Sequence, residues 1–313
     1  MLTLAESETA LWSSSIAVAT NRDIVEVAGP DAASYLHGQV SQNVEQLPEG
    51  ASAWTLLLEP TGRVTAWARL TRVATEVFWL DVDAGFGAPT LARLERFKLR
   101  TKAEFRLHEA VPVLALRGPS SPTAAAVLDQ VAVLAATDVS RVVATDLDWP
   151  GTSGIDLLGL EAAGAATLLD ALGIGLGDPL IGELERIEAG RPAMGHEFAE
   201  KTIPAETGVV ERSADFAKGC YVGQELVARV DSRGNNTPRT VYPVRVATTT
   251  VPIPGSELVL DGVVVGTITS AVAASDHVVA LASIKRGVEV PASAHVDVDG
   301  QLASAEISAV RWA

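Results

Sequence analysis

The sequence is short of cysteine: Cys220 is the only one in 313 residues, so an internal disulfide is excluded. Its five histidines are scattered, without the ligand spacing of a zinc site. No apolar run approaches the roughly 20 residues that span a bilayer. The first residues also lack a basic leader, with Glu6 and Glu8 where a signal peptide carries Lys or Arg. We therefore expect a cytoplasmic protein without metal ligands or a membrane segment.

Basic residues are also scarce. The chain has 24 Lys and Arg against 39 Asp and Glu, a formal net charge of −15. This excess of negative charge opposes broad contact with nucleic acid or an anionic membrane. We expect no direct nucleic-acid partner, and any anionic ligand would need a local group of cationic side chains.

What is abundant is apolar sequence: 48% of the residues are hydrophobic and 20% are charged, which is typical of a folded chain with a large core. Strand and helix patterns alternate up to about residue 235. Beyond it, β-rich runs are separated by Asp261-Gly262 and Asp299-Gly300, which are strong hairpin signals. The patterns predict an α+β region over residues 1–235 and a C-terminal β-barrel over 236–313.

Cys220 lies in the stretch "ADFAKGCYVGQELVARV". A lone cysteine is most often a small buried hydrophobe. Here the glycines on either side favour a tight, exposed loop, which precedes a helix that begins near Gln224 and Glu225. A helix N-terminus and the nearby Lys218 would both favour the thiolate. Since iron–sulfur clusters commonly need four ligands, Cys220 would serve one only together with a partner chain or a small thiol.

Three cations stand two residues apart in "FKLRTKAEF": Lys98, Arg100 and Lys102. If the backbone is extended from about residue 97, they line one face and suit a polycarboxylate or a phosphate. The alternative is a solvated edge strand that charge protects from aggregation.

Acidic residues form a further candidate set. Asp156 lies in "GTSGIDLLG", and Glu185, Arg186 and Glu188 lie in "LERIEAGRP". A carboxylate in a pocket accepts paired N–H donors from an aminopyrimidine-like ring. The alternative is a turn acid and a solvated helix face.

The string "KGCYVGQE", followed by "VAR" and "RGNN", closely resembles the signature of the YgfZ family, which comprises folate-binding proteins linked to the maintenance of iron–sulfur enzymes. The wider chain resembles that family and its relative, the glycine-cleavage T-protein, a tetrahydrofolate-dependent aminomethyltransferase. The likeness runs through "PTGRV", "FKLRTKAEF", "GTSGIDLLG", "RIEAGRP" and "TIPAETG". Its most specific part is the motif Lys218, Gly219, Cys220, Tyr221, Gly223, Gln224 and Glu225.

The resemblance implies interlocked α/β lobes around a central folate cavity, with a β-barrel beside them. It implies tetrahydrofolate or a derivative as the ligand, and Asp156 as the carboxylate that faces the pterin. Arg186 and Glu188 are further candidates for folate binding. On electrostatic grounds, we assign the folate glutamate tail to Lys98, Arg100 and Lys102.

One departure separates the two relatives. T-proteins carry an aspartate pair where this chain has Ala66 and Trp67, and neither residue supplies a carboxylate for proton transfer. We therefore predict a folate-binding accessory protein for the assembly or repair of iron–sulfur enzymes, acting indirectly on tRNA modification, with Cys220 and Lys218 in the reactive loop. The alternatives are a tetrahydrofolate-dependent aminomethyltransferase and a module that senses folate or docks through its barrel.

Overall fold

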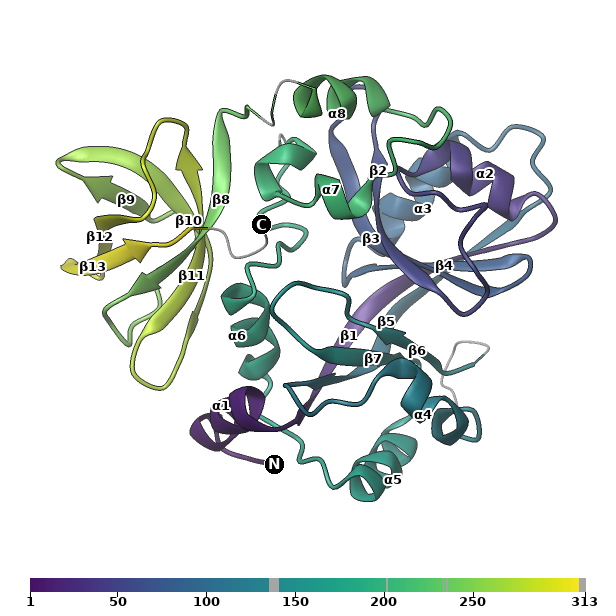
Figure 1. The fold of residues 1–313 in the computed structure, drawn as a ribbon, viewed down its shortest axis with the longest axis horizontal. Coiled ribbons are helices and arrows are strands. Elements are labelled where there is room, and N and C mark those ends of the chain that lie inside the picture. Colours follow the sequence, from purple (N-terminus) through teal and green to yellow (C-terminus); the bar gives the residue numbers. More distant parts are fainter. Residues whose placement is uncertain (135–140, 201, 233, 235, 310–313) are drawn as a thin grey trace.

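The computed structural model describes residues 1–134, 141–200, 202–232, 234 and 236–309. A seven-stranded antiparallel sheet with its helices forms one part, and a closed barrel forms the other (Figure 1). Across the sheet, the strands follow the order β2 (Ser52–Leu58), β3 (Val64–Ala74), β4 (Val77–Asp83), β1 (Ile16–Ala28), β5 (Glu104–Arg117), β7 (Gly154–Leu158) and β6 (Val143–Asp146). The long strands β1 and β5 pair along nearly their whole length and hold the two halves of the sheet together.

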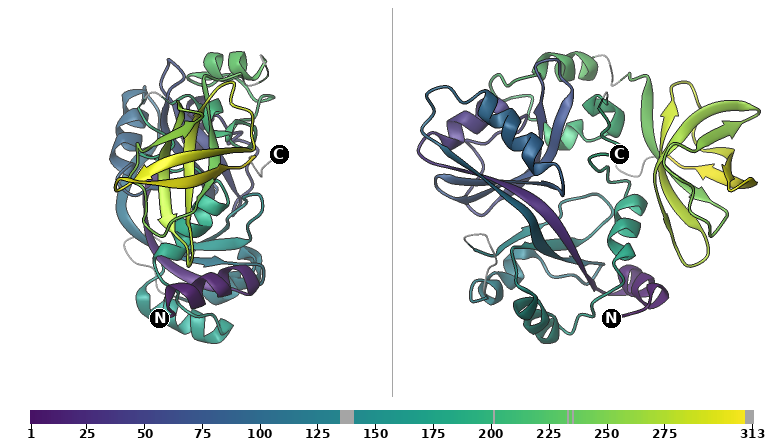
Figure 2. Two further views of the ribbon diagram at one scale, coloured as in Figure 1. Left: turned by 90° about the vertical axis from the view of Figure 1, so that its left-hand side faces the viewer. Right: turned by 180° about the vertical axis from the view of Figure 1, so that it is seen from behind.

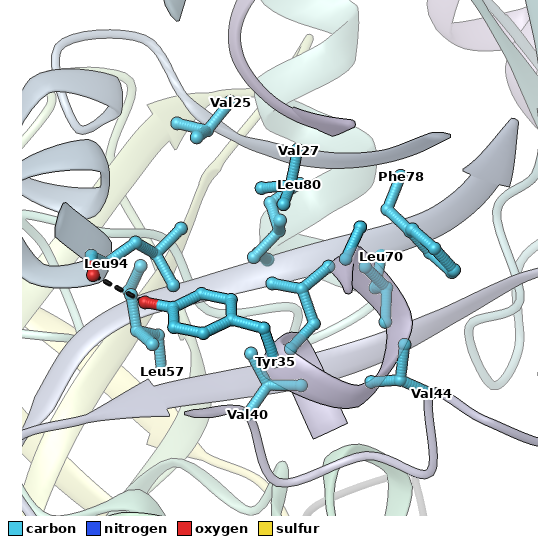
Figure 3. Packing of buried hydrophobic residues seen from close by; sticks show 14 of the residues in the cluster. Val25, Val27, Tyr35, Val40, Val44, Leu57, Leu70, Phe78, Leu80 and Leu94 are labelled. Atoms are coloured by element: carbon cyan, nitrogen blue, oxygen red, sulfur yellow. Dashed lines mark hydrogen bonds between the residues drawn. The ribbon is translucent and has the colours of Figure 1, made fainter. Parts of the chain in front are cut away.

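Strand alternation gives the sheet two different faces. In β1, β3 and β4, residues such as Val25, Leu70 and Leu80 point to one side and form an apolar core (Figure 3). The residues between them, among which are Arg22 and Arg69, point to the other side because neighbours along a strand face opposite ways. The sheet therefore has an apolar outer face and a charged inner one.

Helices close the apolar face. Helices α2 (Ala32–Gln39) and α3 (Gly87–Arg96) cover the half made by β2, β3 and β4. Helices α4 (Ala124–Val131) and α5 (Ala162–Leu172) cover the half made by β5, β7 and β6. Just before the barrel, the chain forms three short elements: η1 (Pro204–Thr207), α7 (Val210–Ser213) and α8 (Gln224–Asp231).

The C-terminal barrel closes in the order β10 (Val263–Ala273), β11 (Val278–Lys285), β8 (Arg239–Val246), β13 (Gln301–Ile307), β12 (Ala292–Val298) and β9 (Glu257–Leu260). Both predicted hairpins are present. Asp261 and Gly262 have φ of 50° and 77°, and Asp299 and Gly300 have φ of 53° and 81°. Two successive positive φ values are the requirement of the type I′ turn that these dipeptides favour.

Helix α6 (Leu180–Glu188) joins the barrel to the sheet (Figure 2). Its residues Ile181, Leu184 and Ile187 share one buried cluster with barrel side chains such as Leu281 and with Val18 of β1. Helix α1 (Leu4–Ser13), which the sequence patterns did not predict, adds Leu11 to the same cluster. No described helix is long and apolar enough to cross a membrane.

The structure confirms the predicted α+β class and the barrel, and it corrects one local prediction. Helix α3 ends at Arg96, and the next strand begins only at Glu104. Arg100 has φ of 54°, a left-handed conformation that no extended strand contains. The prediction of an extended segment from residue 97 is therefore wrong. The proposed division at 235/236 stays a prediction, and residue 235 lies outside the described part of the chain.

We predict that Leu184→Ala lowers the free energy of unfolding by about 2–5 kcal/mol, because Leu184 is 1% exposed in the cluster that joins sheet and barrel. Leu180→Ala is the matched control on the same helix, since Leu180 is 47% exposed and should cost less than about 1 kcal/mol. Urea unfolding measures both. Equal effects of the two changes would contradict this account of the junction.

Candidate functional site

A cavity of about 460 Å³ lies on the charged face of the sheet. Strands β1, β4, β5 and β7 form one wall, and α6 with the segment after it forms the other. Its charged lining residues are Arg22, Asp83, Arg117, Asp156, Glu183, Arg186 and Arg191. The cavity is thus bordered by four arginines and three acids, in a chain with a large overall excess of acids.

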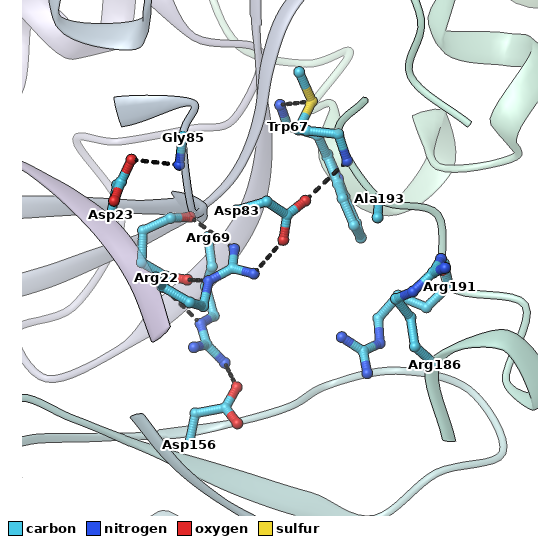
Figure 4. Close-up of polar contacts among 12 residues, drawn as sticks. Arg22, Asp23, Trp67, Arg69, Asp83, Gly85, Asp156, Arg186, Arg191 and Ala193 are labelled. Atoms are coloured by element: carbon cyan, nitrogen blue, oxygen red, sulfur yellow. Dashed lines mark hydrogen bonds and ion pairs between the residues drawn. The ribbon is translucent and has the colours of Figure 1, made fainter. Parts of the chain in front are cut away.

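Buried ion pairs connect the strands behind this cavity (Figure 4). Arg22 pairs with Asp83 at 2.6 Å and with Asp81 at 2.7 Å. Asp81 also accepts a hydrogen bond from Nε of Arg69 at 3.0 Å. Both Arg69 and Asp81 are 2% exposed or less, so each charge depends on the other for compensation.

Asp156 continues the chain of charges into the other half of the sheet. Its Oδ2 accepts from Arg69 at 2.8 Å and its Oδ1 accepts from Arg117 at 2.6 Å. Although burial opposes ionisation, the two guanidinium groups hold the pKa of Asp156 well below its usual range. Asp156 is therefore an ionised acceptor at the cavity wall.

Glu185 of α6 and its partner Arg191 form the end of the chain of charges. Oε2 of Glu185 lies 2.5 Å from Nη2 of Arg191 and 3.4 Å from Nε of Arg117. The alternating series is Asp83, Arg22, Asp81, Arg69, Asp156, Arg117, Glu185 and Arg191, which we call the ion chain. It carries four positive and four negative charges.

Arg186 borders the cavity, but protein groups already bind it. It donates to both oxygens of Glu183, to the Arg191 carbonyl and to Glu197. Glu197 in turn accepts from Thr269 and Ser270 of the barrel strand β10, at 2.6 Å each. Arg186 therefore holds the cavity wall against the barrel.

The other residues predicted to bind folate lie elsewhere. Glu188 does not line this cavity and lies 3.5 Å from Arg245 of the barrel. Lys98, Arg100 and Lys102 are exposed and do not line it either. The backbone of Lys102 approaches Gly29, just past the end of β1. Since the cavity borders residues 18–22 of β1, this cationic group lies roughly 20 Å further along the strand, at about 3.3 Å per residue.

The Cys220 loop lies over the end of α2. Cys220 itself is exposed and is not among the residues that line the cavity. Lys218 donates from Nζ to the carbonyl oxygens of His37, Val40 and Gln42 at 2.5, 2.7 and 3.0 Å. Lys218 thus caps the C-terminal end of α2, where carbonyl groups lack helical partners. Burial lowers the pKa of this ammonium group to about 8.

Two glycines fix the second half of the loop. Gly223 precedes α8 with φ of 84°, and a Cβ there would lie 2.6 Å from the Glu59 carbonyl oxygen. A Cβ on Gly62 would lie 2.4 Å from Cβ of Leu226 in α8. Gln224 adds a hydrogen bond from the Tyr221 amide at 3.1 Å. Gly223 of the motif and Gly62 of the β2–β3 turn are therefore required for the close packing between α8 and that turn.

Ala66 and Trp67, which stand where T-proteins carry aspartates, are both buried. The Trp67 ring stacks on Trp54 with centroids 4.2 Å apart, and its Nε1 donates to Ser213 at 3.0 Å. Trp149 and Phe198 complete this aromatic cluster. Indole rings fill the position, so this part of the site offers no carboxylate for proton transfer.

The ion chain was missed in the sequence, although a signal for it exists. In "VTAWARLTRVA" and "VFWLDVD", charged residues alternate with apolar ones inside strands that are otherwise buried. If both faces of a sheet are covered, charged side chains at such positions have no access to solvent. The alternation therefore predicts a buried charged face. Among the described residues, no three His, Cys, Asp or Glu side chains are grouped as metal ligands.

Comparison with known proteins agrees with this geometry. Residues 6–148 match the GCVT N-terminal domain model. The fold is similar to the glycine cleavage system aminomethyltransferase T of Bartonella henselae, with a TM-score of 0.79 over 99% of this chain and 89% of that one, at 18% identity. The fold is thus that of the aminomethyltransferase class.

Relatives found by sequence similarity are more specific than the fold. The tRNA-modifying protein YgfZ of Klebsiella pneumoniae is 26% identical over 76% of this chain and 73% of its own length. That of Pectobacterium atrosepticum is 28% identical over 76% and 72%. An uncharacterized protein of Haemophilus influenzae is 28% identical over 81% and 82%. The chain is thus similar in sequence to YgfZ proteins and in part to the GCVT N-terminal domain.

We predict that Asp156→Asn lowers the free energy of unfolding near neutral pH by about 3–5 kcal/mol, because it leaves Arg69 and Arg117 without their shared counter-charge. Since the folded pKa of Asp156 is depressed, its contribution is present above about pH 4 and is lost as the pH falls further. The difference between wild type and variant should therefore shrink between pH 4 and pH 2. Asp129→Asn, on the exposed face of α4, is the control. A difference in the free energy of unfolding between wild type and Asp156→Asn that stays constant across this pH range would contradict the prediction.

Proposed function

We propose that the cavity binds tetrahydrofolate or a derivative, and that the protein is a folate-binding accessory factor for the assembly or repair of iron–sulfur enzymes, with an indirect effect on tRNA modification. The observation that carries the proposal is a polar cavity lined by Asp156, in a chain that is similar in sequence to YgfZ proteins. The YgfZ relatives, which are named tRNA-modifying proteins, support the tRNA link.

The cavity suits a pterin in size and chemistry. Its volume of about 460 Å³ falls in the range of small-molecule sites, about 300–1,000 Å³. A carboxylate has about four lone-pair positions, and arginines use one on each Asp156 oxygen. Asp156 therefore retains acceptor capacity for the amino and ring N–H groups of a pterin. When bound, a reduced folate would supply one-carbon or redox chemistry that the side chains lack.

The same contacts disfavour the aminomethyltransferase reaction. A general acid or base works best with a pKa near the operating pH. Arginines instead lower the pKa of Asp156 and of Glu183, and Arg22 donates to the third cavity acid, Asp83. Trp67 occupies the place of the missing carboxylate. The site is built to bind and orient a ligand.

We assign the second part of the function to the Cys220 loop. The thiol is exposed, so it is accessible to a partner protein or a small thiol. Lys218 positions the loop through its three carbonyl contacts with the end of α2. Because Cys220 does not line the cavity, folate binding and the work of the thiol are separable.

The place of the glutamate tail is a further proposal. Lys102 borders a separate hollow beside Gly29, Pro30 and Glu104, whereas Lys98 packs over the Phe105 ring at 4.7 Å. A long polyglutamate tail would have to leave the cavity and follow β1 to reach these cations. The assignment of Lys98, Arg100 and Lys102 to the tail stays a prediction.

We predict that Gly182→Leu abolishes folate binding, because Gly182 of α6 lines the cavity and a larger side chain there would fill it. Gly182→Ala is the matched control. Its Cβ would lie 3.4 Å from Cγ1 of Val18, an ordinary contact, so binding should persist. Calorimetric titration with tetrahydrofolate under anaerobic conditions measures both variants. Full affinity in the leucine variant would place the ligand elsewhere.

We predict that Cys220→Ser binds tetrahydrofolate like the wild type but fails to restore iron–sulfur enzyme activity and tRNA thiolation in a deletion strain. The reason is that the change removes the exposed sulfur and leaves the cavity intact. Ser232→Ala, an exposed change in the turn after α8, is the control and should restore activity. Complete rescue by Cys220→Ser would remove the thiol from the function.

A further inference from the structure

Arg191 differs from the other three arginines at the cavity in the use of its N–H groups. Every guanidinium nitrogen of Arg117 and Arg186 has a protein oxygen as partner. In Arg22, both Nη atoms donate hydrogen bonds, and Nε has an ion-pair contact with Asp81 at 2.7 Å but no hydrogen bond. Arg191 makes one side-chain hydrogen bond among the described residues, from Nη2 to Glu185. Its Nε is buried without a hydrogen-bond partner. Its Nη1 has no partner among the described residues either and is not among the buried atoms, so this nitrogen is left to donate to a ligand acceptor.

Arg191 lies at the same end of the cavity as Asp156. Both residues line the cavity, and Arg191 is close enough to help lower the pKa of the Asp156 carboxyl. Glu185 fixes Arg191 from one side, and Arg69 and Arg117 fix Asp156 from behind. The cavity therefore presents an ionised acceptor and an underused cationic donor to one ligand ring.

We propose that Asp156 and Arg191 together recognise a 2-amino-4-oxopyrimidine edge, with Arg191 as the donor to the 4-oxo oxygen. Such an edge has two adjacent N–H donors, at the 2-amino group and at N3, followed by one acceptor. The carboxylate of Asp156 accepts from the donors, and the guanidinium of Arg191 donates to the acceptor. This inference rests on the proposed folate function and adds a specificity-determining residue to it.

The pairing makes a sharp chemical distinction. In a 4-amino analogue, an N–H donor replaces the oxo acceptor and N3 loses its hydrogen. Arg191 would then face a donor and stay unpaired, and Asp156 would lose one of its two donors. A site built to bind a polar group discriminates strongly against a ligand that lacks it. We expect the wild type to bind the 4-oxo ligand about 10- to 100-fold more tightly, the equivalent of about 1.4–2.8 kcal/mol.

The test compares tetrahydrofolate with its 4-amino counterpart, tetrahydroaminopterin, at the same oxidation level, in wild type and in Arg191→Met. Calorimetry gives the ratio of the two dissociation constants for each protein. We expect the ratio to fall clearly in the variant, because the part that Arg191 contributes is lost, whereas the part that Asp156 contributes through N3–H remains. Because both ligands meet the same protein, a general loss of structure lowers both affinities and leaves the ratio unchanged, and thermal unfolding of the variant checks its fold.

The outcomes separate the two levels of the proposal. A wild-type ratio near one, or an unchanged ratio in Arg191→Met, would overturn the role of Arg191 while leaving folate binding in place. Failure of both ligands to bind the wild type would remove the folate function and this inference with it. Guanosine carries the same edge: if it bound as tightly as tetrahydropterin and with the same dependence on Arg191, the edge recognition would stand and the pterin assignment would fall.

Discussion

The inner face of the sheet depends on the ion chain, because each of its buried charges is compensated by a residue from another element. Arg22 of β1 binds Asp81 and Asp83 of β4, Arg69 of β3 joins Asp81 to Asp156 of β7, and Arg117 of β5 joins Asp156 to Glu185 of α6. Removing an ion from water costs several kcal/mol unless a partner and hydrogen bonds replace the solvent. No link can move far alone, so the strands and α6 hold one relative position.

This constraint also determines the chemistry that the cavity can perform. Acids that pair with arginines remain ionised acceptors, and arginines that pair with acids have few donors left. The cavity wall is thereby prearranged for hydrogen bonding, which reduces the entropy that a ligand loses on binding. Its three carboxylates are poorly arranged for proton transfer, which needs a group that changes charge near neutral pH.

The sequence predicted those features that depend on neighbours in the chain. The hairpins at Asp261-Gly262 and Asp299-Gly300 follow from local backbone preferences, and the interleaved patterns up to residue 235 predicted the mixed region. The single cationic face expected at residues 98–102 does not form, because spacing by two defines a face only in an extended backbone and Arg100 has φ of 54°. Lys218 binds carbonyls about 180 residues earlier, and such a contact leaves no local pattern. Asp156 was singled out by the family resemblance. Its two arginine partners lie on other strands, far away in the sequence, so no local pattern predicts these contacts.

The separation of the thiol from the cavity has a structural basis. At one end of the loop, Lys218 donates to carbonyl groups at the end of α2. At the other end, Gly223 packs against the β2–β3 turn. That turn leads into β3, which carries Arg69 of the ion chain. Packed residues therefore connect Cys220 continuously with Asp156. Contact alone does not couple two sites, because coupling requires an element that can switch between two conformations. The anchors of the loop involve no residue that lines the cavity, so the position of Cys220 does not depend on the cavity wall. Under the proposed function, ligand binding and the thiol would therefore belong to two separate places on the same structure.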